Sequence, residues 1–209
     1  MHITLYGATG NAGSRILSEA LSRGHHVTAV VRDAAKLSPR PGLTFTVGEH
    51  STPDQIVPQI QGSDAVVSAL GPGPDDPGRL VSLIDPLIAA VQQNGGPRLL
   101  VVGGAGTLNV APGVTLIDSG YLPAEWVGIA KAHLEVLNHL RASNIDWTSF
   151  CPASFFEPGE RTGKFRLGTD DLVSDANCQS RISMEDYAIA LVDELEDPHH
   201  IRSRFTIGY

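Results

Sequence analysis

The chain has 209 residues, of which 42% are hydrophobic and 18% are charged, so its composition is that of a globular protein and not of a disordered one. Its length suits one domain or a large domain with an insertion, with a core that needs no metal or disulfide to hold it. The formal net charge is -8 and the 15 lysines and arginines form no basic run, which argues against a nucleic-acid groove.

Short apolar runs alternate with amphipathic segments along the chain. Strands are predicted at residues 3–6, 26–31, 43–47, 65–70, 99–102, 147–150 and 205–207, and helices at 12–23, 52–60, 80–93 and 124–141. A last helix is predicted from a Ser183 cap to about Glu196, before Pro198. Pro86 predicts a kink or break in the third helix. Residues 159–180 fit neither period and are interpreted as an irregular insertion or hairpin near the site.

Strands that alternate with helices indicate βαβ units and a doubly wound α/β fold, with a mostly parallel sheet flanked by helices on both faces. We expect one domain over residues 1–209, with the small insertion at about 159–180. Such sheets bind ligands beyond the carboxyl ends of their strands, near the switch in strand order. The candidate site is therefore built from the loops at 7–13, 32–36, 48–50, 71–78, 103–110 and 151–158.

The stretch YGATGNAGSRI places three glycines between the first strand and the first helix. Glycines let the backbone turn tightly and approach phosphates, and the helix that follows directs free N–H groups and its positive dipole end toward them. Gly7 is expected to permit the turn, Gly10 the approach of a phosphate, and Gly13 the packing of helix on strand. Thr9 and Asn11 can add side-chain hydrogen bonds. The position of the motif favours a dinucleotide-binding, Rossmann-type domain over a merely flexible turn.

Arg32 ends the second predicted strand, nineteen residues after Gly13. An acidic residue is expected about 20 residues on where the ribose 2′-hydroxyl of NAD is bound. A guanidinium at this place can instead pair with a 2′-phosphate and stack on adenine, with help from Lys36. We therefore favour NADP(H) over NAD(H). The alternative is that Arg32 is solvated and Asp33 binds the ribose.

The remaining patterns favour a cytoplasmic protein without a metal, membrane or nucleic-acid partner. Cys151 and Cys178 are too few for a disulfide scaffold and are expected to be reduced thiols. The chain starts directly with a predicted strand, without a visible signal peptide, and no apolar stretch approaches the roughly 20 residues of a membrane span. The eight histidines show no HxxxH or HExxH spacing.

Six stretches carry a resemblance to a known group: GATGNAGSRI, VVRD, DAVVSALG, VVGGAGTL, ISMEDYAIALVDELE and RFTIG. They resemble the atypical short-chain dehydrogenase/reductase superfamily, and within it the NmrA-like NAD(P)H-binding proteins. VVGGAGTL and CPASFFEPGERTG are most similar to bacterial proteins proposed to be NADH-flavin reductases, relatives of biliverdin-IXβ/flavin reductase. The resemblance covers nearly the whole chain, with residues 159–180 matching least.

The resemblance implies a cofactor site, position by position. The residues that match the pyrophosphate loop are Gly7, Thr9, Gly10, Asn11, Ala12 and Gly13. Arg32 matches the residue that contacts the adenosine phosphate. Glu49 and His50 match a pair of residues beside adenine, which in the family is an acidic residue followed by an apolar one; His50 departs from this pattern. Around the nicotinamide ribose and ring, the matching residues are Ala69, Leu70, Gly71, the run from Gly103 to Gly106, Pro152, Ala153 and Ser154.

One departure from the superfamily concerns the proton donor. Its typical Tyr stands four residues before a Lys on the long helix, and here Lys131 follows Val127. The Ser or Thr of the fifth strand is also displaced, with Gly106 near its place and Thr107 one residue later. Carbonyl reduction of the usual type is therefore doubtful. Lys131 either holds the nicotinamide ribose hydroxyls or is simply a solvated residue of the helix.

Hydride transfer to an acceptor that delocalises charge needs little beyond positioning. Flavins such as FMN or FAD, quinones and linear tetrapyrroles are such acceptors, and residues 107–126 with Phe155 and Phe156 can line a pocket for them. Tyr121 and Ser154 join Lys131 and Thr107 as candidate catalytic residues without a supporting pattern. A small planar substrate is thus expected. The alternatives are a non-catalytic NADP(H) sensor of the NmrA-like type and, less favoured, a nucleotide-sugar epimerase or dehydratase.

Overall fold

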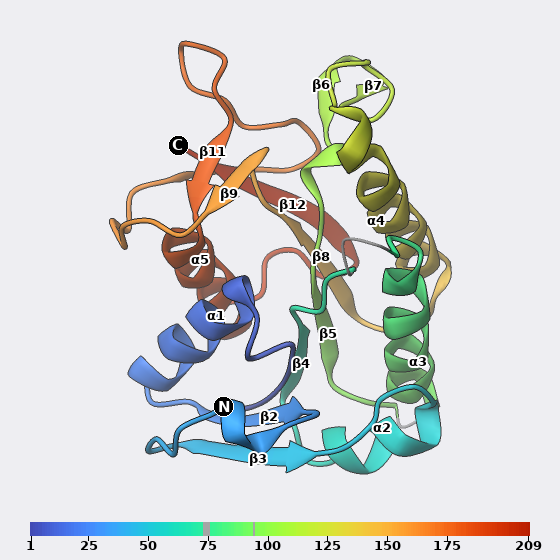
Figure 1. The fold of residues 1–209 in the computed structure, drawn as a ribbon, viewed down its shortest axis with the longest axis vertical. Coiled ribbons are helices and arrows are strands. Elements are labelled where there is room, and N and C mark those ends of the chain that lie inside the picture. Colours follow the sequence, from blue (N-terminus) through green and yellow to red (C-terminus); the bar gives the residue numbers. More distant parts are fainter. Residues whose placement is uncertain (73–75, 94) are drawn as a thin grey trace.

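The computed structural model describes residues 1–72, 76–93 and 95–209, and one eight-stranded sheet forms its centre (Figure 1). From one edge to the other the strands are β10 (Arg166–Gly168), β12 (Ser203–Gly208), β8 (Trp147–Cys151), β5 (Arg98–Val102), β4 (Ala65–Ser68), β1 (His2–Tyr6), β2 (His26–Val31) and β3 (Leu43–Val47). Neighbouring strands are parallel except β10, which is antiparallel to β12. The predicted Rossmann-type, mostly parallel sheet is confirmed.

Helices cover both faces of this sheet. On one face α1 (Asn11–Ser22) packs against α5 (Met184–Glu196), and on the other lie α2 (Pro53–Ile60), α3 (Arg79–Gln93) and α4 (Ala124–Ala142) (Figure 1). Successive residues of a strand point to opposite faces, so Leu99 enters the core beneath α2–α4 and Leu100 the core beneath α1 and α5. Both β4 and β8 are buried at every position: β4 reads almost as an apolar run, AVVS, whereas β8, WTSFC, also buries the hydroxyls of Thr148 and Ser149.

Two predicted elements differ from the structure. Helix α3 continues through Pro86, where we predicted a kink or break. Its buried face, with Leu80, Ile84 and Leu87, offsets the roughly 3 kcal/mol that an internal proline costs. The strand predicted at 65–70 ends at Ser68, which leaves two of its predicted residues in the loop that follows.

Several short elements surround the carboxyl ends of the central strands. They are the 3-10 turns η1 (Ala34–Lys36) and η2 (Ala105–Thr107), the β6 (Asn109–Ala111) and β7 (Val114–Thr115) hairpin, and the parallel pair β9 (Phe155–Glu157) and β11 (Arg181–Ser183). The stretch 159–180 is irregular apart from β10, which adds an edge strand to the sheet. That the whole chain is one domain with an insertion stays a prediction.

The strand order reverses between β1 and β4, where a Rossmann-type sheet opens its ligand crevice. Figure 1 shows α1, β9 and β11 on one side of these carboxyl ends, and α4 with the β6–β7 hairpin on the other. Residues 73–75 of the predicted 71–78 site loop lie outside the described residues. Throughout the described ranges, the helices are too short or too polar to cross a membrane.

Candidate cofactor-binding site

The loop between β1 and α1 has a backbone that requires glycine at two positions. Gly7 has a φ of +81°, and a Cβ there would lie 2.5 Å from the carbonyl oxygen of Ala69. A Cβ on Gly13 would lie 2.1 Å from the carbonyl oxygen of Gly7, so the helix can pack on the loop only without a side chain. The N–H of Gly10 donates to the same Gly7 oxygen at 2.9 Å and closes the turn. The loop thus has the tight geometry that a phosphate-binding turn needs.

The amino end of α1 is open to a ligand. Gly10 is its N-cap and provides no side-chain cap, and the first turn carries no acidic residue. Thr9, Gly10 and Asn11 are exposed there. The free N–H groups and the positive end of the helix dipole therefore face solvent, where an anion can satisfy them. These residues fit the pyrophosphate of a dinucleotide.

Two cations and one acidic residue follow β2, and they differ in whether their side chains already have a partner. Arg32 is exposed at the end of the strand, and Lys36 is exposed at the end of η1. Asp33 is the N-cap of η1, and its Oδ1 accepts a hydrogen bond from the N–H of Ala35 at 3.0 Å. The carboxylate of Asp33 therefore already has a structural partner, whereas the two cations face solvent.

The loop after β3 contributes a histidine with an unsatisfied nitrogen. Nδ1 of His50 is buried and has no hydrogen-bond partner among the described residues, and its ring meets the ring of Tyr6 edge-on with 5.5 Å between centroids. Burial lowers the pKa of His50, as do the charges of Arg32 and Arg79, while Glu49 opposes them. Arg79 begins α3, so two arginines from distant segments of the chain both act on the His50 ring at this end of the site.

The carboxyl ends of β4, β5 and β8 are adjacent because the three strands are paired in register. The predicted residues that follow these strands are Ala69, Leu70, Gly71, Gly103, Gly104, Pro152 and Ala153. A Cβ on Gly103 would lie 2.7 Å from Sγ of Cys151, and one on Gly104 would lie 2.8 Å from the ring of His133. Both glycines therefore bring the backbone of this predicted floor into contact with the side chains beneath it.

Among the described residues, no side chain at the predicted nicotinamide end is placed to donate the proton that carbonyl reduction needs. Thr107 is only 2% exposed, and its hydroxyl donates to the carbonyl oxygen of Gly104 at 3.0 Å. Val127 is partly buried on α4, and Lys131 is exposed one turn later. Cys151 lies 3.5 Å from the Thr107 hydroxyl, and burial raises the pKa of its thiol, so it stays protonated.

The two remaining candidate catalytic residues, Tyr121 and Ser154, are exposed to solvent. Tyr121 is 80% exposed ahead of α4, and Ser154 is exposed where its own N–H donates to Oγ of Ser180 at 3.2 Å. Tyr187 is fully buried and donates to the carbonyl oxygen of Phe150 at 2.7 Å, so it has a structural role.

Sequence reasoning missed Arg79 and the burial of His133 against the floor. Neither belongs to a motif, because both meet the site through contacts between distant segments. Among the described residues, no cluster of three or more histidines, cysteines or acidic residues could hold a metal ion.

Comparisons with known proteins agree with this geometry. The family model for NAD(P)H-binding proteins matches residues 7–198. The uncharacterized protein YwnB of Bacillus subtilis is 40% identical over 211 residues, which cover 99% of this chain and 98% of YwnB.

Two solved structures are similar over their full length. A protein of Bacteroides thetaiotaomicron, named as a proposed epimerase, is 43% identical with a TM-score of 0.92, over 100% of this chain and 96% of that one. A Streptococcus pneumoniae protein, named as a proposed NADH-flavin reductase, is 35% identical with a TM-score of 0.88, over 100% of this chain and 99% of that one. These relatives share the fold but not one named reaction. The chain belongs to the NAD(P)H-binding family, whose Rossmann-type, oxidoreductase-like fold binds a nicotinamide cofactor.

Proposed function

We propose that the protein is an NADPH-dependent reductase that transfers hydride to a planar acceptor such as a flavin, a quinone or a tetrapyrrole. The observation that carries this proposal is that the described residues at the predicted nicotinamide end offer no positioned proton donor. Val127 stands where the usual Tyr would, and the Thr107 hydroxyl donates to the carbonyl oxygen of Gly104. An acceptor that delocalises the incoming charge needs no such donor, because water can supply its proton.

The chain's contribution to this reaction is binding and orientation. When bound, NADPH supplies the hydride; NADPH, a proton and the oxidised acceptor give NADP⁺ and the two-electron-reduced acceptor. The glycine loop and the amino end of α1 hold the pyrophosphate, with Gly7 and Gly13 fixing the turn. Gly103 and Gly104, which carry no side chains, would form the floor that positions the nicotinamide.

The preference for NADPH rests on the end of β2. Arg32 and Lys36 are exposed cations that can pair with a 2′-phosphate. Asp33 is the residue that would otherwise bind the ribose of NAD, and its carboxylate is engaged with the N–H of Ala35. These contacts favour NADP(H) over NAD(H).

A replacement at Arg32 tests this preference. We expect Arg32→Ala to weaken NADPH binding about 10- to 100-fold, because it removes a charge-assisted hydrogen bond, and to leave NADH binding within about twofold. Cofactor fluorescence titration measures both affinities. Arg40→Ala is the matched control, since Arg40 is also exposed but donates to Ser18 on α1. Equal losses for NADPH and NADH in Arg32→Ala would contradict the assignment.

The second candidate function is a non-catalytic NADP(H) sensor. The apolar Val127 favours it as much as it favours the reductase, because neither needs a proton donor. Oxidation of NADPH by the purified protein, with FMN, FAD, a quinone and a linear tetrapyrrole as acceptors, distinguishes the two when NADPH binding is measured in the same samples. Turnover above the protein-free rate supports the reductase. Tight NADPH binding without turnover of any acceptor supports the sensor.

A further inference from the structure

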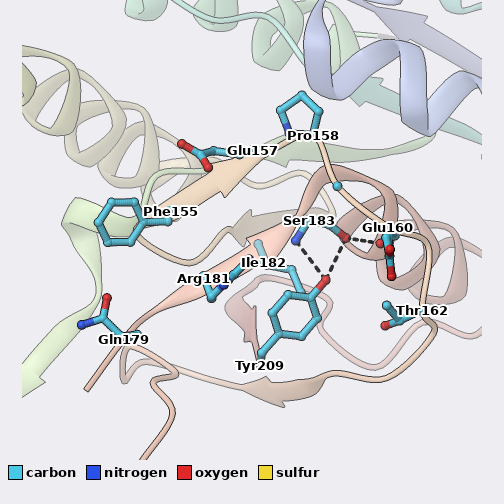
Figure 2. A pocket seen from close by; sticks show the side chains of 11 residues that line it. Phe155, Glu157, Pro158, Glu160, Thr162, Gln179, Arg181, Ile182, Ser183 and Tyr209 are labelled. Carbon is cyan, nitrogen blue, oxygen red and sulfur yellow. Dashed lines mark hydrogen bonds between the residues drawn. The ribbon is translucent and has the colours of Figure 1, made fainter. Parts of the chain in front are cut away.

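A cavity of about 610 Å³ lies over the outer face of the β9–β11 pair (Figure 2). In this parallel pair Phe155 is opposite Arg181 and Glu157 is opposite Ser183, so all four side chains point to the same face. The residues between them turn inward, where Ile182 is buried in the core. The wall of the cavity is the segment 158–162 together with the C-terminal residue.

One end of the cavity lies beside the predicted nicotinamide end of the cofactor site. Phe155 lines the cavity and is only two residues beyond Ala153, a distance of at most about 7 Å along the chain. Figure 2 shows the Phe155 ring on the side of the cavity away from Pro158. None of the lining residues belongs to the predicted cofactor set, so the cavity adjoins that site without being part of it.

The other end of the cavity is tied to the first turn of α1. The N–H of Gly159 donates to Oε2 of Glu185 at 2.7 Å, and Oε1 of Glu185 pairs with Nε of Arg15 at 3.0 Å. Nη1 of Arg15 donates in turn to the carbonyl oxygen of Asn11 at 3.1 Å. A chain of polar contacts thus links the wall of the cavity at Gly159 to the first turn of α1, which begins the predicted pyrophosphate site.

The wall of the cavity is held by a buried carboxylate. Asp186 is fully buried at the start of α5 and accepts from the N–H groups of Thr162 and Gly163 at 2.7 and 2.8 Å. It also accepts from the phenol of Tyr209 at 2.8 Å, and the oxygen of that phenol accepts from the N–H of Ser183 at 3.2 Å. A wall with its backbone donors satisfied in this way is preformed, as small-molecule sites usually are.

The lining of the cavity includes an aromatic ring, a cation and two carboxylates. Within the described part of the chain, the guanidinium of Arg181 makes no hydrogen bond or ion pair, and it is exposed beside Phe155 and Gln179. Glu157 follows Phe155 on the same face of β9, whereas Glu160 lies across the cavity near Thr162 (Figure 2). An aromatic ring and an uncommitted cation at one end suit a flat ligand that carries an anionic group.

We propose that this cavity is the acceptor site and that Arg181 binds a phosphate or carboxylate carried by the acceptor. The substrate class is then a planar aromatic acceptor with an anionic substituent, whose ring reaches the nicotinamide end beside Phe155. This inference rests on the proposed reductase function, and it adds the side chain that discriminates charged from uncharged acceptors. Glu157 and Glu160 accept hydrogen bonds from the hydroxyl or ring N–H groups of the same ligand.

FMN and riboflavin test the inference, because they share one ring system and differ only in the phosphate. We expect kcat/KM for FMN to exceed that for riboflavin about tenfold, the effect of one exposed charge-assisted hydrogen bond. Arg181→Gln reduces this ratio to near one by raising the KM for FMN, and Arg181→Lys retains part of it. Arg141→Gln, an exposed arginine in the last turn of α4, is the matched control and keeps the wild-type ratio.

The inference and the proposed function can fail separately. FMN titrations of the protein saturated with NADP⁺, followed by flavin fluorescence, measure binding without turnover. Equal efficiency for FMN and riboflavin, or a ratio that Arg181→Gln leaves unchanged, overturns the inference while the reductase function stands. FMN binding that depends on Arg181, without turnover of FMN, FAD, the quinone or the tetrapyrrole, supports the site and overturns the reductase. If FMN does not bind the NADP⁺-loaded protein, the assigned site is wrong.

Discussion

His133 offers the sharpest test of the geometry beneath the predicted nicotinamide floor. It lies on α4 with its ring against Gly104, so close that a Cβ on Gly104 would be 2.8 Å from two ring atoms. Burial lowers the pKa of His133 from its usual 6.5 to about 4. The ring is therefore neutral in the folded protein at neutral pH, and protonation would place a positive charge under the floor.

The expected effect on stability follows from this shift. Since the folded pKa is depressed, the unfolded chain binds the proton more tightly than the folded protein. Above pH 6.5 His133 is neutral in both states, so its burial does not lower the free energy of unfolding. As the pH falls from 6.5 to 4, the free energy of unfolding decreases. The decrease from this one group is about 2 kcal/mol at pH 5 and about 3 kcal/mol below pH 4.

Urea unfolding of the wild type and of His133→Leu at pH 7.5, 6.5, 5.5 and 5.0 measures this contribution. The leucine fills a similar volume and does not titrate, so the variant is expected to lose about 2 kcal/mol less between pH 7.5 and 5.0. A smaller slope remains, because burial also lowers the pKa of His50. If the variant keeps the full wild-type slope, the buried, neutral state of His133 is wrong.

Two further predictions concern the cofactor loop and the proton donor. Gly13→Ala is expected to weaken NADPH binding at least tenfold and to cost about 1 to 3 kcal/mol of unfolding free energy, because its Cβ would lie 2.1 Å from the Gly7 oxygen. Cofactor titration and urea unfolding measure the two effects, and an unaffected Gly13→Ala would contradict the loop geometry. Tyr121→Phe is expected to keep kcat for FMN reduction within about twofold, since the exposed phenol has no partner; a loss above tenfold would assign it the donor role.

Much of the fold can be predicted from the sequence because the central strands are buried on both faces. A strand such as β4 is then apolar at most of its positions, here Ala65, Val66 and Val67, and that pattern is readable in one sequence. Helix ends are readable for a similar local reason: Ser183 caps α5 by accepting from the N–H of Asp186 at 3.0 Å. Such signals involve residues a few positions apart, so no tertiary contact is needed to recognise them.

The elements around the site cannot be predicted in the same way. β9 and β11 have three residues each, which is too short for a period of two to stand out, and their pairing joins segments 26 residues apart. Pro86 is tolerated in α3 because the helix packs on the core, which a local rule cannot register. The cavity beside β9 therefore appears only once distant residues such as Arg181 and Phe155 are brought opposite one another.

The exposure of the candidate catalytic residues limits the chemistry further. Thr107 donates its hydroxyl inward to a backbone carbonyl, and Val127 has no polar group to offer. Tyr121, Lys131 and Ser154 are exposed to solvent, where a proton donor competes with water and gains little from being on the protein. A carbonyl oxygen that develops negative charge would thus find no preorganised donor in the described residues, whereas a ring system that spreads the charge would need none. This difference is the reason for proposing a planar acceptor and not a ketone or an aldehyde.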